Sequence, residues 1–344
     1  RVNEPFGDTV QFDLMPQFAV DRAQLSAGAD PTYGLNALGG ALALRLKNGL
    51  DNPGFRGEFS GGSFGRMTGT AEYGANSGPW GLYVGTTHFD ETGWRVQSPS
   101  QITQAVADVA FRSGRTDAGI TVTYADTNLN GNGPAPVELL AFDRSAVFTF
   151  PDITNNRLAF VQGRYNLVVN STWSIQASAY ARKLDRQTFN GDEAEFGMCN
   201  DDALPAGAPA DTLCHGVDDD SDGVLDDDDD AQAEAQPLAD IITGRFITRR
   251  DATGDGAFNR TDTASDGYGA TLQATARGTL GQREHILMFG ASGDVADVLF
   301  GMDSEIGTMT PTRTVTGSGL FTGVYGKGGD DLFNTKLKTE NQAT

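Results

Sequence analysis

Several segments of the chain alternate apolar or small residues with polar ones. In residues 172–182 the odd-numbered positions are Trp, Ile and Ala, whereas the even-numbered positions are Thr, Ser, Gln, Tyr and Arg. Residues 103–112, 120–124 and 268–280 repeat this pattern. Because successive side chains of a β-strand point to opposite faces, each segment has one apolar and one polar face. From residue 55 onward the pattern predicts about nine or ten strands.

The connections between these strands alternate in length. Short turns fall at 76–79, 114–117, 169–172 and 280–284, and the long connections between them are 90–101, about 127–155 and about 186–265. Short turns on one side and long loops on the other are typical of an outer-membrane β-barrel. A β-sandwich has no reason to keep this order. The sequence therefore predicts an all-β fold, an antiparallel transmembrane β-barrel.

One predicted strand tests this interpretation. Trp80 and Trp94 bracket it and fit an aromatic girdle at the two membrane interfaces. Simple alternation turns His88 of the same strand toward lipid. The barrel interpretation therefore requires either a bulge at His88 or an apolar band that ends before it.

Composition narrows the functions that are possible. The chain has 344 residues and a net charge of −21, with 46 acids against 25 Lys and Arg. This acidity argues against nucleic acid as a partner, because phosphate binding needs clustered basic residues. No apolar run is long enough for a transmembrane helix. The first residue is Arg and no signal segment opens the chain, so we expect a fragment or a processed product.

No motif of enzyme chemistry is present in the sequence. The histidines His88, His215 and His285 are scattered, and no zinc spacing, nucleophile elbow or phosphate loop occurs. The acids lie in a solvated run rather than as a general acid–base pair. We therefore expect a protein that is not an enzyme.

Residues 1–50 differ from the rest, with irregular polar turns and two strand-like runs at 18–28 and 40–49. Residues 21–49 resemble the end of the plug domain of TonB-dependent outer-membrane receptors. The matching positions are Gly28, Pro31, Tyr33, Gly34, Asn36, Ala37, Gly39 and Gly40. Residues 1–16, 54–74 and 88–95 resemble the preceding plug segment, the first barrel strands and the end of the third strand. Independently of the family, Gly39 and Gly40 before an apolar strand predict close backbone approach or a positive φ.

The resemblance implies two domains. Residues 1–50 are the C-terminal part of a small α/β plug, and residues 51–344 are the N-terminal half of a 22-stranded barrel with a long acidic extracellular loop at 186–265. The polar residues 326–344 do not look like a closing strand. Because half a barrel leaves unpaired edges in lipid, the remaining strands are expected from a longer protein or from another chain.

The resemblance also implies a function. It predicts a receptor in the outer membrane of a Gram-negative bacterium that takes up a scarce extracellular ligand. The ligand could be a ferric siderophore, cobalamin or a saccharide, and the sequence does not choose between them. The implied partners are outer-membrane lipid, the small ligand, and the TonB complex, which is contacted through a segment that this sequence does not include.

The acidic loop contains a candidate calcium site. Residues 186–262 hold twenty acids and five arginines, for a local net charge of −15. The segment 218–229 spaces oxygen ligands as a helix-free calcium loop does, with Gly223 at the sharp turn. Its candidate ligands are Asp218, Asp220, Asp222, Val224, Asp226 and Asp229. The segment 251–262 is a looser match, with Asp251, Asp255, Ala257, Asn259 and Asp262. A solvated acidic run is the alternative for both segments.

The two cysteines, Cys199 and Cys214, lie in this same loop. Their spacing suggests a disulfide formed in an oxidising compartment, and two free thiols are the alternative. Such a bridge closes a loop of about 15 residues and adds roughly 3 kcal/mol to the free energy of unfolding in the chain-entropy account.

Two other functions stay open at this point. The chain could be a secreted, calcium-stabilised β-sandwich for binding or adhesion, or an inactive truncated receptor remnant.

Overall fold

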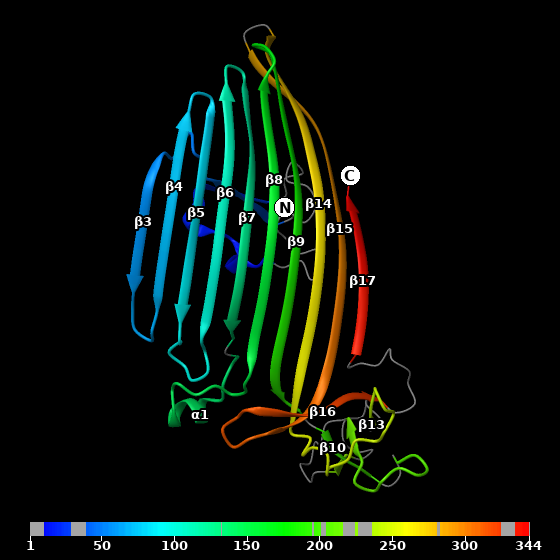
Figure 1. The fold of residues 1–344 in the computed structure, drawn as a ribbon. Helices are drawn as coiled ribbons and strands as arrows, with labels where there is room; N and C mark the ends of the chain where they lie inside the picture. The colour runs from blue at the N-terminus through cyan, green and yellow to red at the C-terminus, as the bar shows by residue number, and fades with distance from the viewer. Residues whose placement is uncertain are drawn as a thin grey trace.

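The computed structural model describes residues 10–28, 39–131, 133–194, 196–200, 204–215, 224–225, 236–280, 283–324 and 334–343. Ten antiparallel strands of these residues form one large sheet, each paired with the next along the chain (Figure 1). They are β3 (Gly54–Gly61), β4 (Met67–Ser77), β5 (Trp80–Glu91), β6 (Ser100–Ser113), β7 (Thr116–Asn130), β8 (Asp152–Val168), β9 (Trp173–Glu193), β14 (Gly256–Leu280), β15 (Arg283–Met309) and β17 (Asn334–Ala343). The predicted all-β fold and strand number are confirmed.

The predicted alternation of short and long connections is also confirmed. The connections β4–β5, β6–β7 and β8–β9 are short and lie at one end of the sheet, the upper end in Figure 1. The long connections lie at the other end and carry further elements. These are α1 (Val137–Phe142), β10 (Phe196–Cys199), β11 (Leu213–His215), β12 (Val224–Leu225), β13 (Gln236–Asp240) and β16 (Val315–Val324).

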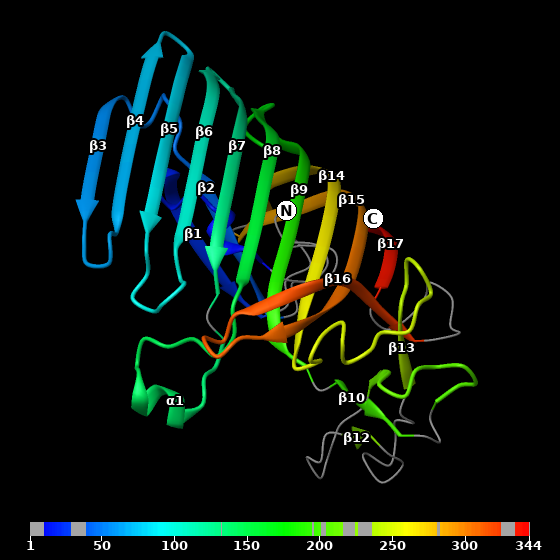
Figure 2. The same ribbon diagram turned by 60° about the horizontal axis from the view of Figure 1, so that its bottom comes forward.

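The sheet is strongly curved but is not closed within the described residues, and β3 and β17 lie at its two edges (Figure 2). The polar C-terminal segment includes a strand, β17, which pairs with residues 294–303 of β15. This pairing is made by backbone hydrogen bonds, which do not depend on apolar side chains. Because the sheet is not closed within the described residues, the expectation that residues 326–344 are not a closing strand stays a prediction.

The apolar face of the sheet is exposed. Ile120 is 58% exposed and Leu272 is 56% exposed, and no second sheet covers this face among the described residues. A β-sandwich would bury these side chains between its two sheets. The fold is therefore that of a barrel wall, and the sandwich alternative is wrong. No helix in the described ranges is long and apolar enough to cross a membrane.

The N-terminal segment lies against the concave, polar face of the sheet (Figures 1 and 2). It consists of the short 3₁₀-helices η1 (Phe12–Leu14) and η2 (Gln17–Ala19), followed by β1 (Val20–Ala27) and β2 (Gly40–Leu46). β1 and β2 form a separate antiparallel pair. Since a two-stranded sheet is marginal by itself, the segment depends on the wall for its stability.

Two small apolar clusters join this segment to the wall. Leu14 of η1 packs against Ala125, Leu158 and Leu184 of three wall strands. Ala19 of η2 packs with Tyr83 and Val106, and Phe18 and Leu46 lie against this second cluster. One buried contact of the molecule is therefore that between the N-terminal segment, within residues 10–28 and 39–46, and the inner face of the sheet.

Candidate functional site: the wall, the docked segment and the loops

A row of polar side chains ends the apolar band on the outer face. The strand registers place His88, Thr103, Asp126, Arg157 and Asp185 side by side across β5 to β9. The Nδ1 atom of His88 lies 2.9 Å from the hydroxyl of Thr103, and Arg157 pairs with Asp126 at 3.2 Å. The registers on both sides of β5 run without a shift. The band therefore ends before His88, and no bulge is needed.

The two tryptophans predicted to bracket β5 lie in different settings. Trp80 opens the strand at the short-turn end, where its ring packs on Phe111 with centroids 4.8 Å apart. Trp94 lies in the connection after β5, beyond the polar row, and the Arg95 guanidinium stacks on it at 5.0 Å. Only Trp80 borders the apolar rows, so the pair does not measure the height of the band.

The inner face carries charged and polar side chains with partners. Asp108 of β6 is 2% exposed and accepts hydrogen bonds from Thr121 of β7 and from the guanidinium of Arg164 on β8. A buried carboxylate is tolerated only when such donors replace its water. The three residues lie on adjacent strands and all point inward, which fits the polar lumen of a barrel.

Asp13 of η1 is the polar anchor of the N-terminal segment. One oxygen of its carboxylate accepts hydrogen bonds from Thr127 at 2.9 Å and from Asn156 at 3.1 Å. The amide of Gln104 donates to the main-chain carbonyls of Asp13 and Met15. Three wall strands therefore hold η1 through hydrogen bonds, beside the Leu14 cluster.

A second anchor lies where the segment joins the sheet. The ammonium of Lys47, just after β2, pairs with Glu72 of β4 at 2.7 Å, and the hydroxyl of Tyr83 donates to the same carboxylate at 2.7 Å. The exposed fractions of the Lys47 and Glu72 side chains are 18% and 10%, and Tyr83 is fully buried. Removal of either Lys47 or Glu72 would leave the other charge without its partner and poorly hydrated.

The turn after Lys47 is closely packed against the wall. A Cβ on Gly49 would lie 2.2 Å from the carbonyl oxygen of Leu82, and one on Gly81 would lie 2.5 Å from the amide nitrogen of Leu50. The Asn48 side chain accepts hydrogen bonds from the amides of Leu50 and Asp51. Only glycine allows two backbones to approach this closely.

An ion-pair network closes this junction. Arg112 of β6 donates to the carboxylate of Asp51 at 2.9 Å, and Arg45 donates to it at 2.8 Å. The hydrogen bonds from Arg112 and then Asn48 hold the pKa of Asp51 well below its usual value. Asp51 is therefore ionised at neutral pH and joins β2, the turn and β6.

The glycines of the plug motif lie at the end of the β1–β2 pair. Gly40 has φ +146°, and a Cβ there would lie 2.6 Å from the carbonyl oxygen of Ser26, so both reasons for glycine apply. Gly28 has φ +85° and donates its amide hydrogen to Gly39 at 3.3 Å. The other motif residues are outside the described ranges, and their role stays a prediction: Pro31, Tyr33, Gly34, Asn36 and Ala37.

The long connections pack together into a small region with its own core. β10, β11, β13 and β16 form an extension of the sheet, and Leu213, Leu238, Ile247 and Ile306 are fully buried within it. Because β16 comes from the β15–β17 connection, two long connections share one core. The region lies at the end of the sheet opposite the short turns (Figure 1).

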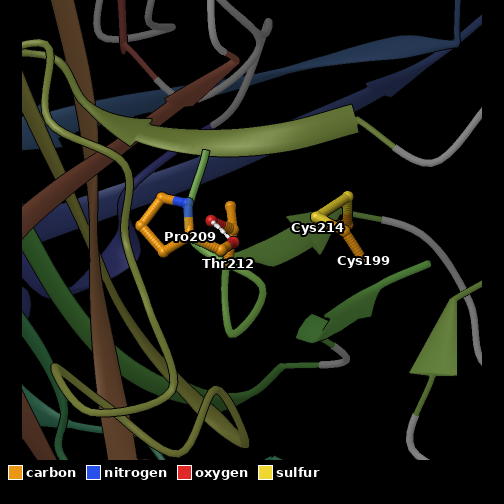
Figure 3. Close-up of a disulfide and its surroundings, with 4 residues drawn as sticks. All are labelled: Cys199, Pro209, Thr212 and Cys214. Atoms are coloured by element: carbon orange, nitrogen blue, oxygen red, sulfur yellow. Dashed lines mark hydrogen bonds between the residues drawn. A yellow bond between two sulfur atoms is a disulfide. The ribbon is translucent and has the colours of Figure 1, made fainter. Parts of the chain in front are cut away.

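The predicted disulfide is present in this region. Cys199 at the end of β10 is bonded to Cys214 of β11, with their Cα atoms 5.0 Å apart (Figure 3). The Cys199 amide donates to the carbonyl of Thr212, and the Thr212 hydroxyl donates to Pro209 at 2.7 Å. The bridge therefore closes a turn that is also held by backbone hydrogen bonds.

The structure does not test the first calcium loop. Its ligands Asp218, Asp220, Asp222, Asp226 and Asp229 lie outside the described residues, and Val224 belongs to β12. Calcium binding there stays a prediction.

The second calcium segment is partly extended. Ala257, Asn259 and Asp262 belong to β14, whereas a calcium loop folds around its ion. Asp251 accepts hydrogen bonds from Arg245 and Thr248, which outweigh burial and lower its pKa. Asp255 accepts the amide of Met309 at 2.9 Å. Within the described ranges, no three acids, histidines or cysteines gather as a metal site requires.

Solved structures share the fold of most of this chain. The ferric citrate transporter FecA in its unliganded form matches 94% of this chain with a TM-score of 0.58 at 11% identity. The chain has the fold of a TonB-dependent outer-membrane receptor. The pyoverdine outer membrane receptor FpvA from Pseudomonas aeruginosa PAO1 matches 94% of the chain with a TM-score of 0.57 at 12% identity. The match covers 39% of FecA and 42% of FpvA, so the chain spans about two fifths of these receptors' length.

No protein-family model and no curated protein sequence matches the chain. The solved structures that it resembles are transport receptors rather than enzymes, from the outer membrane of Gram-negative bacteria.

The sequence analysis did not identify the wall residues that hold the docked N-terminal segment. Glu72, the partner of Lys47, could have been found, because it is an acid on the polar face of an alternating strand and requires a cation nearby. The Asp13 contacts carry no such signal, since they join positions about 90–140 residues apart. The shared core of the loops also depends on contacts between distant segments.

Proposed function

We propose that this chain is the plug end and the first barrel strands of an outer-membrane receptor for energised uptake of a scarce extracellular ligand. One observation carries the proposal: residues 10–28 and 39–50 dock on the polar face of a curved wall whose opposite face is apolar and exposed. A segment in this place obstructs the lumen and has to move for a ligand to pass.

The contacts of the docked segment fit a part that is displaced in use. Asp13 is held by a few hydrogen bonds to the wall, and the Leu14 cluster is small. Each such hydrogen bond contributes only about 0.5–1.5 kcal/mol, and more for a charged acceptor. A pull through the TonB complex, which the proton gradient of the inner membrane drives, can therefore release it.

Ferric siderophores are the first ligands to test, because the solved structures that resemble this chain include receptors for ferric citrate and pyoverdine. The acidic extracellular region does not exclude an anionic ferric chelate, since salt screens exposed charges beyond about 10 Å. Uptake of iron-loaded citrate, pyoverdine and a catecholate is measured in cells that express the full receptor, with and without a protonophore.

A reversible disulfide between the docked segment and the wall tests whether this segment has to move during uptake. Leu14 and Ala125 pack together, so L14C/A125C places a cysteine pair across the contact. We expect oxidation of the pair to stop uptake while surface binding of the ligand continues, and reduction to restore uptake. The two single-cysteine variants are the controls. Continued uptake through the locked receptor contradicts the proposal.

A further inference from the structure

An apolar groove of about 830 Å³ crosses the outer face of the sheet. Its floor is a row of glycine and alanine on four adjacent strands, in register with one another. These are Gly163 of β8, Ala179 of β9, Ala270 of β14 and Gly293 of β15. Larger apolar side chains border the floor, among them Ile120, Tyr165 and Leu272. The groove exists because the residues in this row, on four strands, have only a hydrogen or a methyl group as side chain.

The groove lies within the apolar rows rather than in the lumen. Ile120 and Gly163 are register partners on the outward face, and Trp80 lines the end of the groove nearest the short turns. Trp80 is 56% exposed, and Trp173 at the start of β9 is 41% exposed. Tryptophans in this position mark the level of lipid headgroups, so the groove opens directly onto the acyl chains beneath them.

An exposed arginine lies at this same level. Arg115, in the short turn between β6 and β7, is exposed, and its guanidinium donates to the carbonyl of Val169 at 2.9 Å. No acid pairs with Arg115 among the described residues, whereas Arg112 nearby is neutralised by Asp51 and Asp117. The remaining N–H groups of Arg115 can bind a phosphate by charge-assisted hydrogen bonds.

The cation and the groove are within reach of one molecule. Ala118, which lines the groove, follows Arg115 by three residues on β7, roughly 10 Å along the strand. A headgroup at Arg115 therefore places the start of an acyl chain at the groove. An apolar groove without a polar entrance would hold any hydrocarbon, but the arginine selects a lipid that carries a phosphate.

We propose that the groove and Arg115 bind one phospholipid of the periplasmic leaflet, with its phosphate on Arg115 and an acyl chain across the floor at Ala270. The site is distinct from the lumen and from the docked segment. The proposal needs only the membrane position of the sheet, so ligand uptake can fail in the lock experiment while lipid binding stands.

The experiment titrates phosphatidylethanolamine onto the full receptor in mild detergent and counts bound lipids by native mass spectrometry. A270L fills the floor, and A276L adds the same side chain on the same face of β14 outside the groove. A179L fills the floor from the next strand, in case A270L does not fold. R115Q removes the headgroup contact, and R283Q removes an exposed arginine at the start of β15, at the same end of the sheet.

We expect one tightly bound phospholipid in the unaltered receptor. A270L or A179L should weaken its binding about tenfold, and R115Q about fivefold, because a cation near the membrane surface contributes about 1 kcal/mol. A276L and R283Q should change it less than about twofold. If A270L and A276L bind the phospholipid equally well, the acyl chain does not lie in the groove and the proposal fails. If R115Q and R283Q bind it equally well, Arg115 does not hold the phosphate. A receptor dimer that A270L dissociates shows that a second copy, not lipid, fills the groove.

Discussion

The docked N-terminal segment meets the wall at two places that use different chemistry. At Asp13 the contacts are hydrogen bonds to Thr127 and Asn156 beside a small apolar cluster. At the junction, a poorly exposed ion pair between Lys47 and Glu72 is combined with backbone contacts that only glycine permits. The first place suits a contact that is broken and remade. The second suits a fixed attachment, so we expect η1 to leave the wall more readily than the residues around Gly49.

The largest effect should come from the buried charge of the junction. E72A leaves the ammonium of Lys47 without its carboxylate and the Tyr83 hydroxyl without an acceptor. We expect the free energy of unfolding to fall by about 3 kcal/mol, measured by urea titration of the receptor in lipid vesicles.

The matched control for E72A removes the whole network. K47M/E72L/Y83F replaces three polar partners by apolar groups of similar size, which is close to neutral for many buried ion pairs. A loss as large in this variant as in E72A would show that packing, rather than the stranded charge, decides the stability of the junction.

A smaller effect should follow from the close backbone contact. A Cβ on Gly81 would lie 2.5 Å from the backbone nitrogen of Leu50, so G81A forces the turn away from β5 and should cost about 2 kcal/mol. G69A on β4 is the control, because a Cβ at Gly69 meets nothing within 4 Å. Equal stability of the two variants would mean that the junction is loose, and the contrast with Asp13 would disappear.

These residues also show which features of the fold can be predicted from the sequence. Alternation along β9 and β14 predicts which side chains lie on the apolar outer face, because the period of a strand is local, and turn lengths predict which end of each strand carries the loops. Gly40 was identifiable as a constrained glycine from the strand that follows it. The partner of Lys47 was not, since nothing near Lys47 in the sequence selects Glu72 over the other acids.

The same limit applies to β17 and to the second calcium segment. The mostly polar residues of β17 give no clear apolar alternation, because its pairing with β15 is made by the backbone. The segment 251–262 has the spacing of ligands, yet Asn259 bonds Asp192 and Ser304 within the sheet. Residues 256–262 of this segment pair with β15, and spacing along the sequence does not reveal such pairing, so calcium binding by the segment stays a prediction.

The smallest effect concerns the exposed ion pairs of the junction. Arg112 and Asp51 are 46% and 33% exposed, so R112Q should cost less than about 1 kcal/mol at neutral pH. The pKa of Asp51 is lowered in the folded protein, so this contribution is present above the ordinary Asp pKa near 4 and is lost as the pH falls toward the folded value.

The measurement is urea unfolding of the receptor and of R112Q at several pH values. We expect the small difference between them to be constant from about pH 7 to pH 5 and to shrink below about pH 4, where Asp51 of the unfolded chain binds a proton. D117N is the control, because Asp117 also bonds Arg112 but does not contact the turn. A difference that grows as the pH falls would show that Asp51 does not hold the junction, and the fixed attachment would then rest on Glu72 and the glycines alone.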